Sequence, residues 1–300
     1  MPTKSRQLPT VSILVTLYGE AGLVQTSLES CLAQRYPNVE IIVVDSGLGS
    51  SGLRAARRYE PYIRVVGIPH RINPGLERSI ALSHAVGDFV LFQDSQDIQF
   101  PDRIAQDVET ARQSRADLVV SVNRWLKPGE PTIFSPEPIC RRERRLLRQM
   151  AIFGEALERS LLSVLQFGGP QPSCVLYRTS IVCALRSYID KGEPYAEKEL
   201  LFRALCRGAR VAINPRITSA RRFDELNELP AVLLDEAHSR RLALAKEYTS
   251  ALQEAGLLRH RLLREALIRH LMDRVYEPAK EQCAPEVARD ALTLTTGLQA

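Results

Sequence analysis

Short runs of apolar, often β-branched residues recur along the first hundred positions of the chain. Residues 11–15 read Val-Ser-Ile-Leu-Val, residues 41–44 read Ile-Ile-Val-Val, and residues 89–92 read Phe-Val-Leu-Phe. Continuous apolar runs of this length are typical of strands buried on both faces of a parallel sheet. Segments with helical spacing lie between them, at roughly residues 23–34 and 78–86. The alternation predicts a doubly wound, mostly parallel α/β sheet.

A different apolar pattern begins after about residue 226. Between residues 257 and 275, pairs of apolar residues recur every four to five positions, with arginines between them. An apolar stripe beside a charged face predicts amphipathic helices, which we expect to pack back on the sheet or to pair in a homodimer. The predicted parts are an α/β domain at residues 1–225, with halves at about 8–125 and 139–225, and a helical region at residues 226–300.

Polar side chains follow each of the three predicted strands directly. Thr16 follows the first strand, Asp45 ends the second, and Asp94 and Asp97 follow the third. Open α/β sheets bind ligands outside the carboxyl ends of their strands, so these side chains are candidates for a ligand or metal site. On this pattern alone, a polar turn that leads into the next helix stays open as the alternative.

Four segments of the chain also carry a family resemblance, and they occur in the family's order. They are residues 11–20, 27–45, 73–76 and 87–97. Together they resemble the family 2 glycosyltransferases, which have the A-type nucleotide-sugar transferase fold. The resemblance covers residues 11–105 well and continues more weakly to about residue 222. It implies a mixed, mostly parallel sheet, to which the apolar pattern after residue 226 adds a C-terminal helical extension.

The resemblance implies an inverting, hexosyltransferase-like enzyme. Such an enzyme moves a sugar from a nucleoside diphosphate donor, here a UDP-sugar, to a hydroxyl of a glycan, a lipid-linked molecule or another acceptor. The donor-binding residues that it implies are Thr16, Tyr18, Glu20, Asp45, Arg78 and Asp94. Glu197 takes the position of the catalytic base when the register is counted back from Arg203 and Gly208. Without that register, Glu197 and Glu199 would be a solvated helix start that complements the helix dipole.

The acid motif that holds a divalent cation in this family is altered here. The chain reads Asp94-Ser95-Gln96-Asp97 where the family pattern is Asp-Ser-Asp-Asp. The resemblance implies Mn²⁺ or Mg²⁺ bound by Asp94 with Gln96 and Asp97. Because a neutral amide is a poorer ligand than a carboxylate for these ions, we expect weak ion binding in the absence of nucleotide.

Two further acids of the family pattern are replaced, by Ser46 and Ala196. Together with Gln96, they support a second hypothesis from another class of protein. The chain would then be a catalytically degenerate protein of the nucleotide-sugar fold that serves as a scaffold or partner subunit. Nucleotide binding and donor turnover distinguish the two hypotheses.

The composition of the chain indicates the cellular compartment of the protein. Six cysteines without a paired short spacing argue against a zinc site and a disulfide framework, and fit a reducing cytoplasm. The basic N-terminus is not followed by an apolar stretch of signal length, and no apolar run approaches the ~20 residues of a membrane span. These features predict a cytoplasmic protein, at most peripheral to the inner face of the membrane.

The net charge of +5 includes an arginine cluster at residues 141–148. This cluster could hold diphosphates, a phospholipid surface or nucleic acid, but we interpret it as the solvated face of a docked helix. It has no interleaved aromatic residues for stacking bases, which argues against nucleic acid as a partner. The proline-rich residues 125–138 before it predict a loop between the two halves of the α/β domain.

Overall fold

The computed structural model describes most of the chain between residues 8 and 299. The described residues are 8–17, 21–46, 51–126, 157–167, 169–186, 189, 196–222, 234–281 and 284–299. The arginine cluster and residues 127–138 of the predicted loop lie outside them. The start predicted for that loop was wrong, because Trp125 belongs to a strand that continues to Leu126.

An eight-stranded sheet runs through the described structure, in the order β3-β2-β1-β4-β7-β6-β8-β5. Its strands are β1 (Val11–Thr16), β2 (Val39–Asp45), β3 (Arg64–Gly67), β4 (Phe89–Asp94), β5 (Asp97–Gln99), β6 (Leu118–Leu126), β7 (Val175–Arg178) and β8 (Val211–Arg222). Strands β3, β2, β1 and β4 are parallel, and β6 is parallel to β8, whereas β7 and β5 pair antiparallel. This mixed, mostly parallel sheet confirms the predicted α/β architecture.

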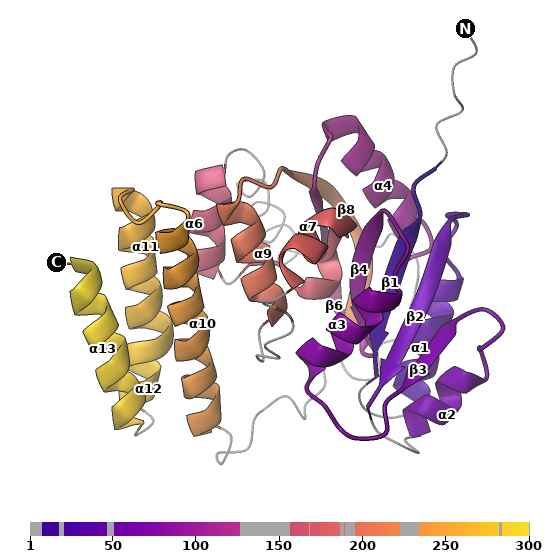
Figure 1. Cartoon of the computed structure of the whole chain (residues 1–300), viewed down its shortest axis with the longest axis horizontal. Helices are drawn as coiled ribbons and strands as arrows, with labels where there is room; N and C mark the ends of the chain where they lie inside the picture. The colour runs from indigo at the N-terminus through magenta and orange to yellow at the C-terminus, as the bar shows by residue number, and fades with distance from the viewer. Residues whose placement is uncertain are drawn as a thin grey trace, which may run out of the picture.

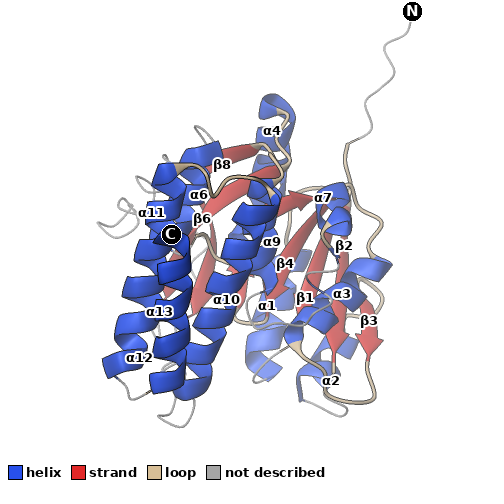
Figure 2. Ribbon diagram, turned by 60° about the vertical axis from the view of Figure 1, so that its left-hand side comes forward, coloured by secondary structure: helices blue, strands red, loops and turns tan. Residues whose placement is uncertain are grey.

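Helices cover both faces of the sheet (Figure 2). They are α1 (Ala21–Leu32), α2 (Ser51–Arg57), α3 (Pro74–His84), α4 (Arg103–Ser114), α6 (Leu157–Phe167), α7 (Thr179–Ala184) and α9 (Ala196–Cys206), with a short 3₁₀ turn, η1 (Pro172–Cys174). Neighbouring residues of β1 belong to opposite faces: Ile13 shares a core cluster with Leu28 of α1, and Leu14 shares one with Leu82 of α3 and Phe202 of α9. Burial on both faces explains the continuous apolar runs of the sequence.

Helix α3 begins earlier than the apolar spacing indicated. The Asn73 side chain accepts a hydrogen bond of 2.9 Å from the Leu76 backbone N–H, and Pro74 occupies the first turn. Both are start signals, since the cap satisfies an unpaired N–H and proline has the backbone angle of a helix. The start at Pro74 puts Arg78 in the second turn, from which it contacts the end of β4.

The C-terminal region is helical, as predicted. It consists of α10 (Leu234–Glu254), α11 (Arg261–Leu271), a π-helical segment η4 (Met272–Tyr276), α12 (Glu277–Glu281) and α13 (Pro285–Gln299). Figure 1 shows α10, α11 and α13 side by side at one end of the molecule, next to α6 and α9. Tyr248 of α10 lies in the same core cluster as Phe202 of α9, with ring centroids 4.2 Å apart.

These helices therefore pack back on the α/β domain, which was one of the two predicted arrangements. Pairing between two copies of the chain stays a prediction. Among the described residues, no helix combines the length and the apolar character that crossing a membrane requires.

Candidate functional site

The predicted polar residues meet at the carboxyl ends of three neighbouring strands. Parallel pairing places Thr16 of β1 beside Val44 of β2 and beside Asp94 of β4. Asp45 follows Val44 directly and is buried. The sheet thus collects at one edge side chains that are up to 78 positions apart in the chain. Tyr18 and Glu20, two other predicted donor-binding residues, lie outside the described residues.

Arg78 joins this edge of the sheet to the start of α9. Its Nη2 donates a 2.8 Å hydrogen bond to Asp94 Oδ1, and its Nη1 forms an ion pair with Glu197 Oε1. The side chains of Arg78 and Glu197 are only 9% and 8% exposed. A buried carboxylate is stable only if it is paired, so this arginine holds both acids in their positions.

Burial raises the pKa of Glu197 above its usual range, although the Arg78 guanidinium acts against that shift. The nearby Asp94 carboxylate adds to the rise. A carboxylate with a raised pKa is a stronger base than an exposed one, which suits it to accept a proton. The predicted alternative, a solvated helix start, is wrong for both Glu197 and Glu199, because both side chains are buried.

Arg221 of β8 is a residue of this site that the sequence did not reveal. Antiparallel pairing of β5 with β8 places it opposite Asp97. Its Nη1 lies 3.3 Å from Asp94 Oδ2 and 3.5 Å from Asp97 Oδ1. A pair of arginines at the end of β8 was the available signal, but it could not be read without knowing which strand lies beside β8.

The two acids of the turn between β4 and β5 have opposite pKa shifts. Burial would raise the pKa of Asp94, but Arg78 and Arg221 outweigh burial and hold it below its usual range. Burial and the neighbouring Asp94 carboxylate raise the pKa of Asp97 to about 6. Asp94 is therefore ionised throughout the neutral range, and Asp97 takes up a proton in mildly acidic solution.

A buried network of polar side chains holds the turn between β4 and β5 in place. Gln93 Nε2 donates to the Asp97 carbonyl at 2.7 Å and to Ser27 Oγ at 2.9 Å, and Ser27 Oγ donates to the Asp94 carbonyl at 3.3 Å. The network continues through Gln99 to Arg103. Because the backbone groups of Asp94 and Asp97 are held in this way, their side chains occupy fixed positions at the edge of the sheet.

The strand ends next to Asp94 present further polar groups. Ser46, where the family pattern has an acid, donates its backbone N–H to Glu77 Oε1 of α3 at 3.2 Å. Within the described residues, Thr16 Oγ1 is buried without a hydrogen-bond partner. A buried hydroxyl without a partner is a natural contact for a bound ligand.

The predicted metal ligands do not fit a resident divalent cation in this geometry. Each carboxylate oxygen of Asp94 is engaged by an arginine, and Asp97 lies against Arg221 as well. Gln96 contributes only a neutral amide. Over the stretches of chain that the structure describes, no group of three or more His, Cys, Asp or Glu side chains could hold a metal ion.

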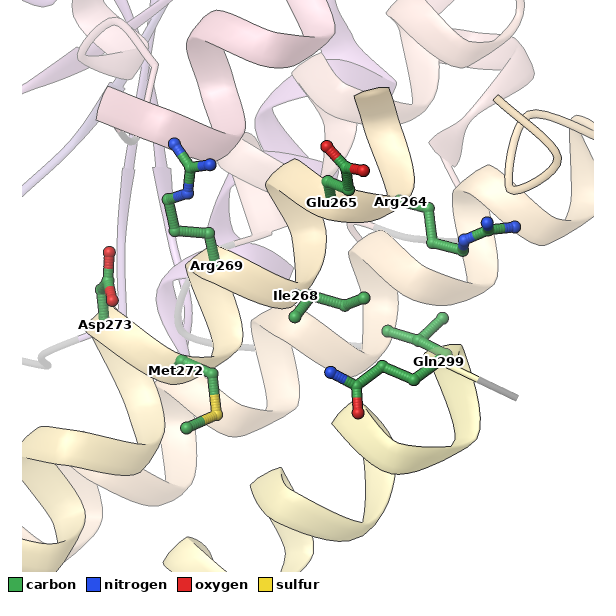
Figure 3. A pocket seen from close by; sticks show the side chains of 8 residues that line it. Arg264, Glu265, Ile268, Arg269, Met272, Asp273 and Gln299 are labelled. Carbon is green, nitrogen blue, oxygen red and sulfur yellow. The ribbon is translucent and has the colours of Figure 1, made fainter. Parts of the chain in front are cut away.

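A separate hollow of about 530 Å³ lies on the C-terminal helices (Figure 3). Its lining comes from α11, η4 and α13: Arg264, Glu265, Ile268, Arg269, Met272, Asp273, Leu298 and Gln299. None of the candidate site residues lines it. The hollow therefore lies apart from the candidate site at the edge of the sheet.

The acids and arginines at the strand ends occupy the position at which open sheets of the α/β class bind ligands. The model of the family described as glycosyl transferase family 2 matches residues 12–182, more than half of the chain. This chain belongs to glycosyl transferase family 2.

Proteins that are similar to this chain in sequence include some that are named glycosyltransferases. The putative glycosyltransferase EpsE of Bacillus subtilis is 34% identical over 116 residues, which cover 37% of this chain and 42% of EpsE. The chain therefore matches less than half the length of that relative.

Among solved structures, S. aureus TarS in complex with UDP is similar, with a TM-score of 0.62 at 18% identity, over 88% of this chain and 72% of that chain. The mannosyltransferase PcManGT from Pyrobaculum calidifontis, in complex with GDP-Man and Mn²⁺, has a TM-score of 0.58 at 18% identity, over 97% of this chain and 80% of that chain. At these identities, the likeness establishes the fold.

Proposed function

We propose that this protein is an inverting glycosyltransferase that moves a sugar from a UDP-sugar to an acceptor hydroxyl of a glycan, a lipid-linked molecule or a related compound. The observation that carries the proposal is the meeting of Arg78, Asp94 and Glu197 at the carboxyl edge of the sheet. Family membership supports it, as do the nucleotide and nucleotide-sugar ligands of the two fold neighbours.

In the proposed reaction, Glu197 is the general base. Its carboxylate takes the proton of the acceptor hydroxyl while that oxygen forms a bond to the anomeric carbon of the donor sugar. The bond from the anomeric carbon to the diphosphate oxygen breaks, and its electron pair leaves with the nucleoside diphosphate. Attack from the side opposite the leaving group inverts the anomeric centre. The raised pKa of Glu197 favours this proton transfer.

The nucleoside of the donor is assigned to the ends of β1 and β2. Thr16 and Asp45 are the described residues there, and the resemblance adds Tyr18 and Glu20 to the same pocket. The buried Asp45 carboxylate and the Thr16 hydroxyl, which has no hydrogen-bond partner among the described residues, support this assignment, because both can form hydrogen bonds to a base or ribose. A divalent cation is not part of the proposal, because arginines already contact both acids that would hold it.

Donor turnover tests the proposal. Nucleotide sugars that raise the melting temperature are first identified in a panel, since a ligand that binds the folded state stabilises it. Glu197→Gln should then lower transfer or donor hydrolysis roughly 100- to 10,000-fold, with the donor affinity nearly unchanged.

Two results would contradict the proposed function. Nucleotide binding without turnover in the parent protein would favour the scaffold hypothesis, which the replacements at Ser46, Gln96 and Ala196 motivate. Full activity in Glu197→Gln would show that another group is the base.

A further inference from the structure

The negative charge that develops on a departing diphosphate needs a positive partner. In this chain, a guanidinium group lies where the family pattern implies a metal ion. We propose that Arg221, with Arg78 beside it, binds the diphosphate of the donor in the place of a divalent cation, so that donor binding and transfer need no metal. The inference rests on the proposed function and adds how the leaving group is held.

The position of Arg221 follows from sheet pairing and not from a chance side-chain contact. Asp97 and Arg221 are register partners across β5 and β8. The backbone N–H of Arg222 also donates to the carbonyl of Gln96 at 3.3 Å, so the two chain segments are bonded on both sides of the pair. Backbone hydrogen bonds therefore fix the base of the Arg221 side chain next to the altered acid motif.

Arginines already contact the acids around Arg221 without a metal. The site has three carboxylates, Asp94, Asp97 and Glu197, and the guanidinium groups of Arg78 and Arg221 offset two of these three negative charges. A divalent ion added here would have to displace an arginine from Asp94 and remain beside it, which opposes binding because the charges repel.

Arg221 also has hydrogen-bonding capacity to spare. Both of its carboxylate contacts use Nη1, and within the described residues Nη2 and Nε have no partner. The side chain is 18% exposed, twice the exposure of Arg78, so its head group reaches the surface of the site. A planar guanidinium with free N–H groups matches the oxygen spacing of a phosphate and binds it through two parallel hydrogen bonds.

Calorimetry with UDP, and in parallel with GDP, tests the inference in the parent protein. The titration is done once in EDTA and once with Mn²⁺. We expect one of these nucleotides to bind in EDTA, with an affinity that Mn²⁺ changes less than about threefold. A requirement for Mn²⁺ would overturn this inference and leave the proposed function standing. Absence of binding under both conditions would overturn both.

Arg221→Gln tests the residue itself. Loss of a charged hydrogen-bond donor should weaken diphosphate binding about 10- to 100-fold in EDTA. Binding of the free nucleoside, which has no phosphate, should stay unchanged and shows that the variant is folded. Arg216→Gln is the matched control, because Arg216 is an exposed arginine of the same strand, and it should bind the nucleotide as the parent does. Equal affinity in Arg221→Gln and the parent would overturn the inference.

A double variant tests the exchange of guanidinium for metal in the opposite direction. Arg221→Ala combined with Gln96→Asp removes the guanidinium and restores the acid of the family motif. It should bind the nucleotide weakly in EDTA and at least about tenfold more tightly with Mn²⁺, whereas Arg221→Ala alone should respond much less to the ion. Tight binding of the double variant in EDTA would contradict the role of Arg221, since nothing would then replace its charge.

Discussion

Arg78 contacts acids from two distant parts of the chain, Asp94 at the end of β4 and Glu197 at the start of α9. Each of these side chains would be unfavourable alone in a buried place, because charge is costly there without a partner. Together they place the candidate base, Glu197, against a guanidinium that also binds Asp94. That guanidinium lowers the pKa of both carboxyl groups relative to the effect of burial alone.

The pH dependence of transfer should show the raised pKa of Glu197. The base works only as a carboxylate, so activity should be present above this pKa and lost as the pH falls through it. The acid limb of kcat/KM should have its midpoint above 4.5, the ordinary value for a glutamate. A midpoint at or below that value would contradict the assignment of the base.

Protonation of Asp97, which has a pKa of about 6, would also produce an acid limb in the pH profile of kcat/KM. A control variant is therefore needed to show which residue causes the limb. Asp97→Asn removes this group and should leave the limb in place if Glu197 is responsible. Its disappearance in Asp97→Asn would assign the limb to Asp97.

Asp45 gives a second prediction for a single residue. Asp45→Ala should weaken nucleotide binding by about 1–3 kcal/mol, the free energy of a lost hydrogen bond to a charged group. The measurement is calorimetric titration of the variant and the parent with UDP. Glu109, an exposed acid of α4, provides a control in Glu109→Ala, which should bind as the parent does. Unchanged affinity in Asp45→Ala would show that the nucleoside binds elsewhere.

Helix α9 has two acids in its first turn, and they form ion pairs with different arginines. Glu197 faces Arg78, whereas Glu199 binds Arg203 at 2.7 Å, and Arg203 also contacts Glu247 and Glu254 of α10 at 2.7 and 3.0 Å. Glu199 thus belongs to the contact between α9 and α10. The spacing of two positions along the helix separates a candidate base from a structural ion pair.

Glu199→Gln should accordingly reduce stability and not the chemical step. Its side chain is 2% exposed, so loss of the charge-assisted bond to Arg203 should lower the free energy of unfolding by about 1–3 kcal/mol. Glu265→Gln is the matched control, because Glu265 and Arg261 form a pair of the same spacing that is exposed to solvent and should contribute little. Chemical unfolding of the two variants, together with the transfer rate, makes the comparison. A large loss of rate in a folded Glu199→Gln would mean that the register of the base was misread.

At the scale of the whole molecule, the C-terminal helices share the core of the α/β domain. Tyr248 of α10 is fully buried and lies in one cluster with strand residues such as Leu14 and Val90. The helical region is therefore part of the same cooperative structure that positions α9. Loosening of α10 should affect the site through α9, because Arg203 of α9 contacts Glu247 of α10.

Two substitutions of Tyr248 separate packing from polarity. Tyr248→Ala should lower the free energy of unfolding by about 3–5 kcal/mol, as expected for removal of a buried aromatic ring. Tyr248→Phe should leave it unchanged or slightly higher, because Tyr248 Oη is buried without a hydrogen-bond partner among the described residues. Thermal and chemical unfolding test both. A marked loss in Tyr248→Phe would show that the hydroxyl has a partner.

The local pattern of the sequence determined the strands and the edge of the sheet that carries the site. A strand buried on both faces must be apolar along its length, so β1, β2 and β4 could be recognised without any partner strand. The polar residues Thr16, Asp45 and Asp94 could be placed together for the same reason, since parallel strands end at one edge. The family motifs added Arg78 and Glu197, which the apolar pattern alone would have left on ordinary helices.

Tertiary structure decided what depends on contacts between distant segments. The pairing of β5 with β8 brings Arg221 to Asp97 across more than a hundred positions, and no local pattern specifies such a partner. Glu199, which the sequence placed at a solvated helix start, is buried and pairs with Arg203, which also contacts Glu247 and Glu254 of α10. Local sequence fixes which residues are apolar and where strands end. Long-range pairing fixes which charge meets which, and here that pairing puts an arginine beside the acids of the altered motif.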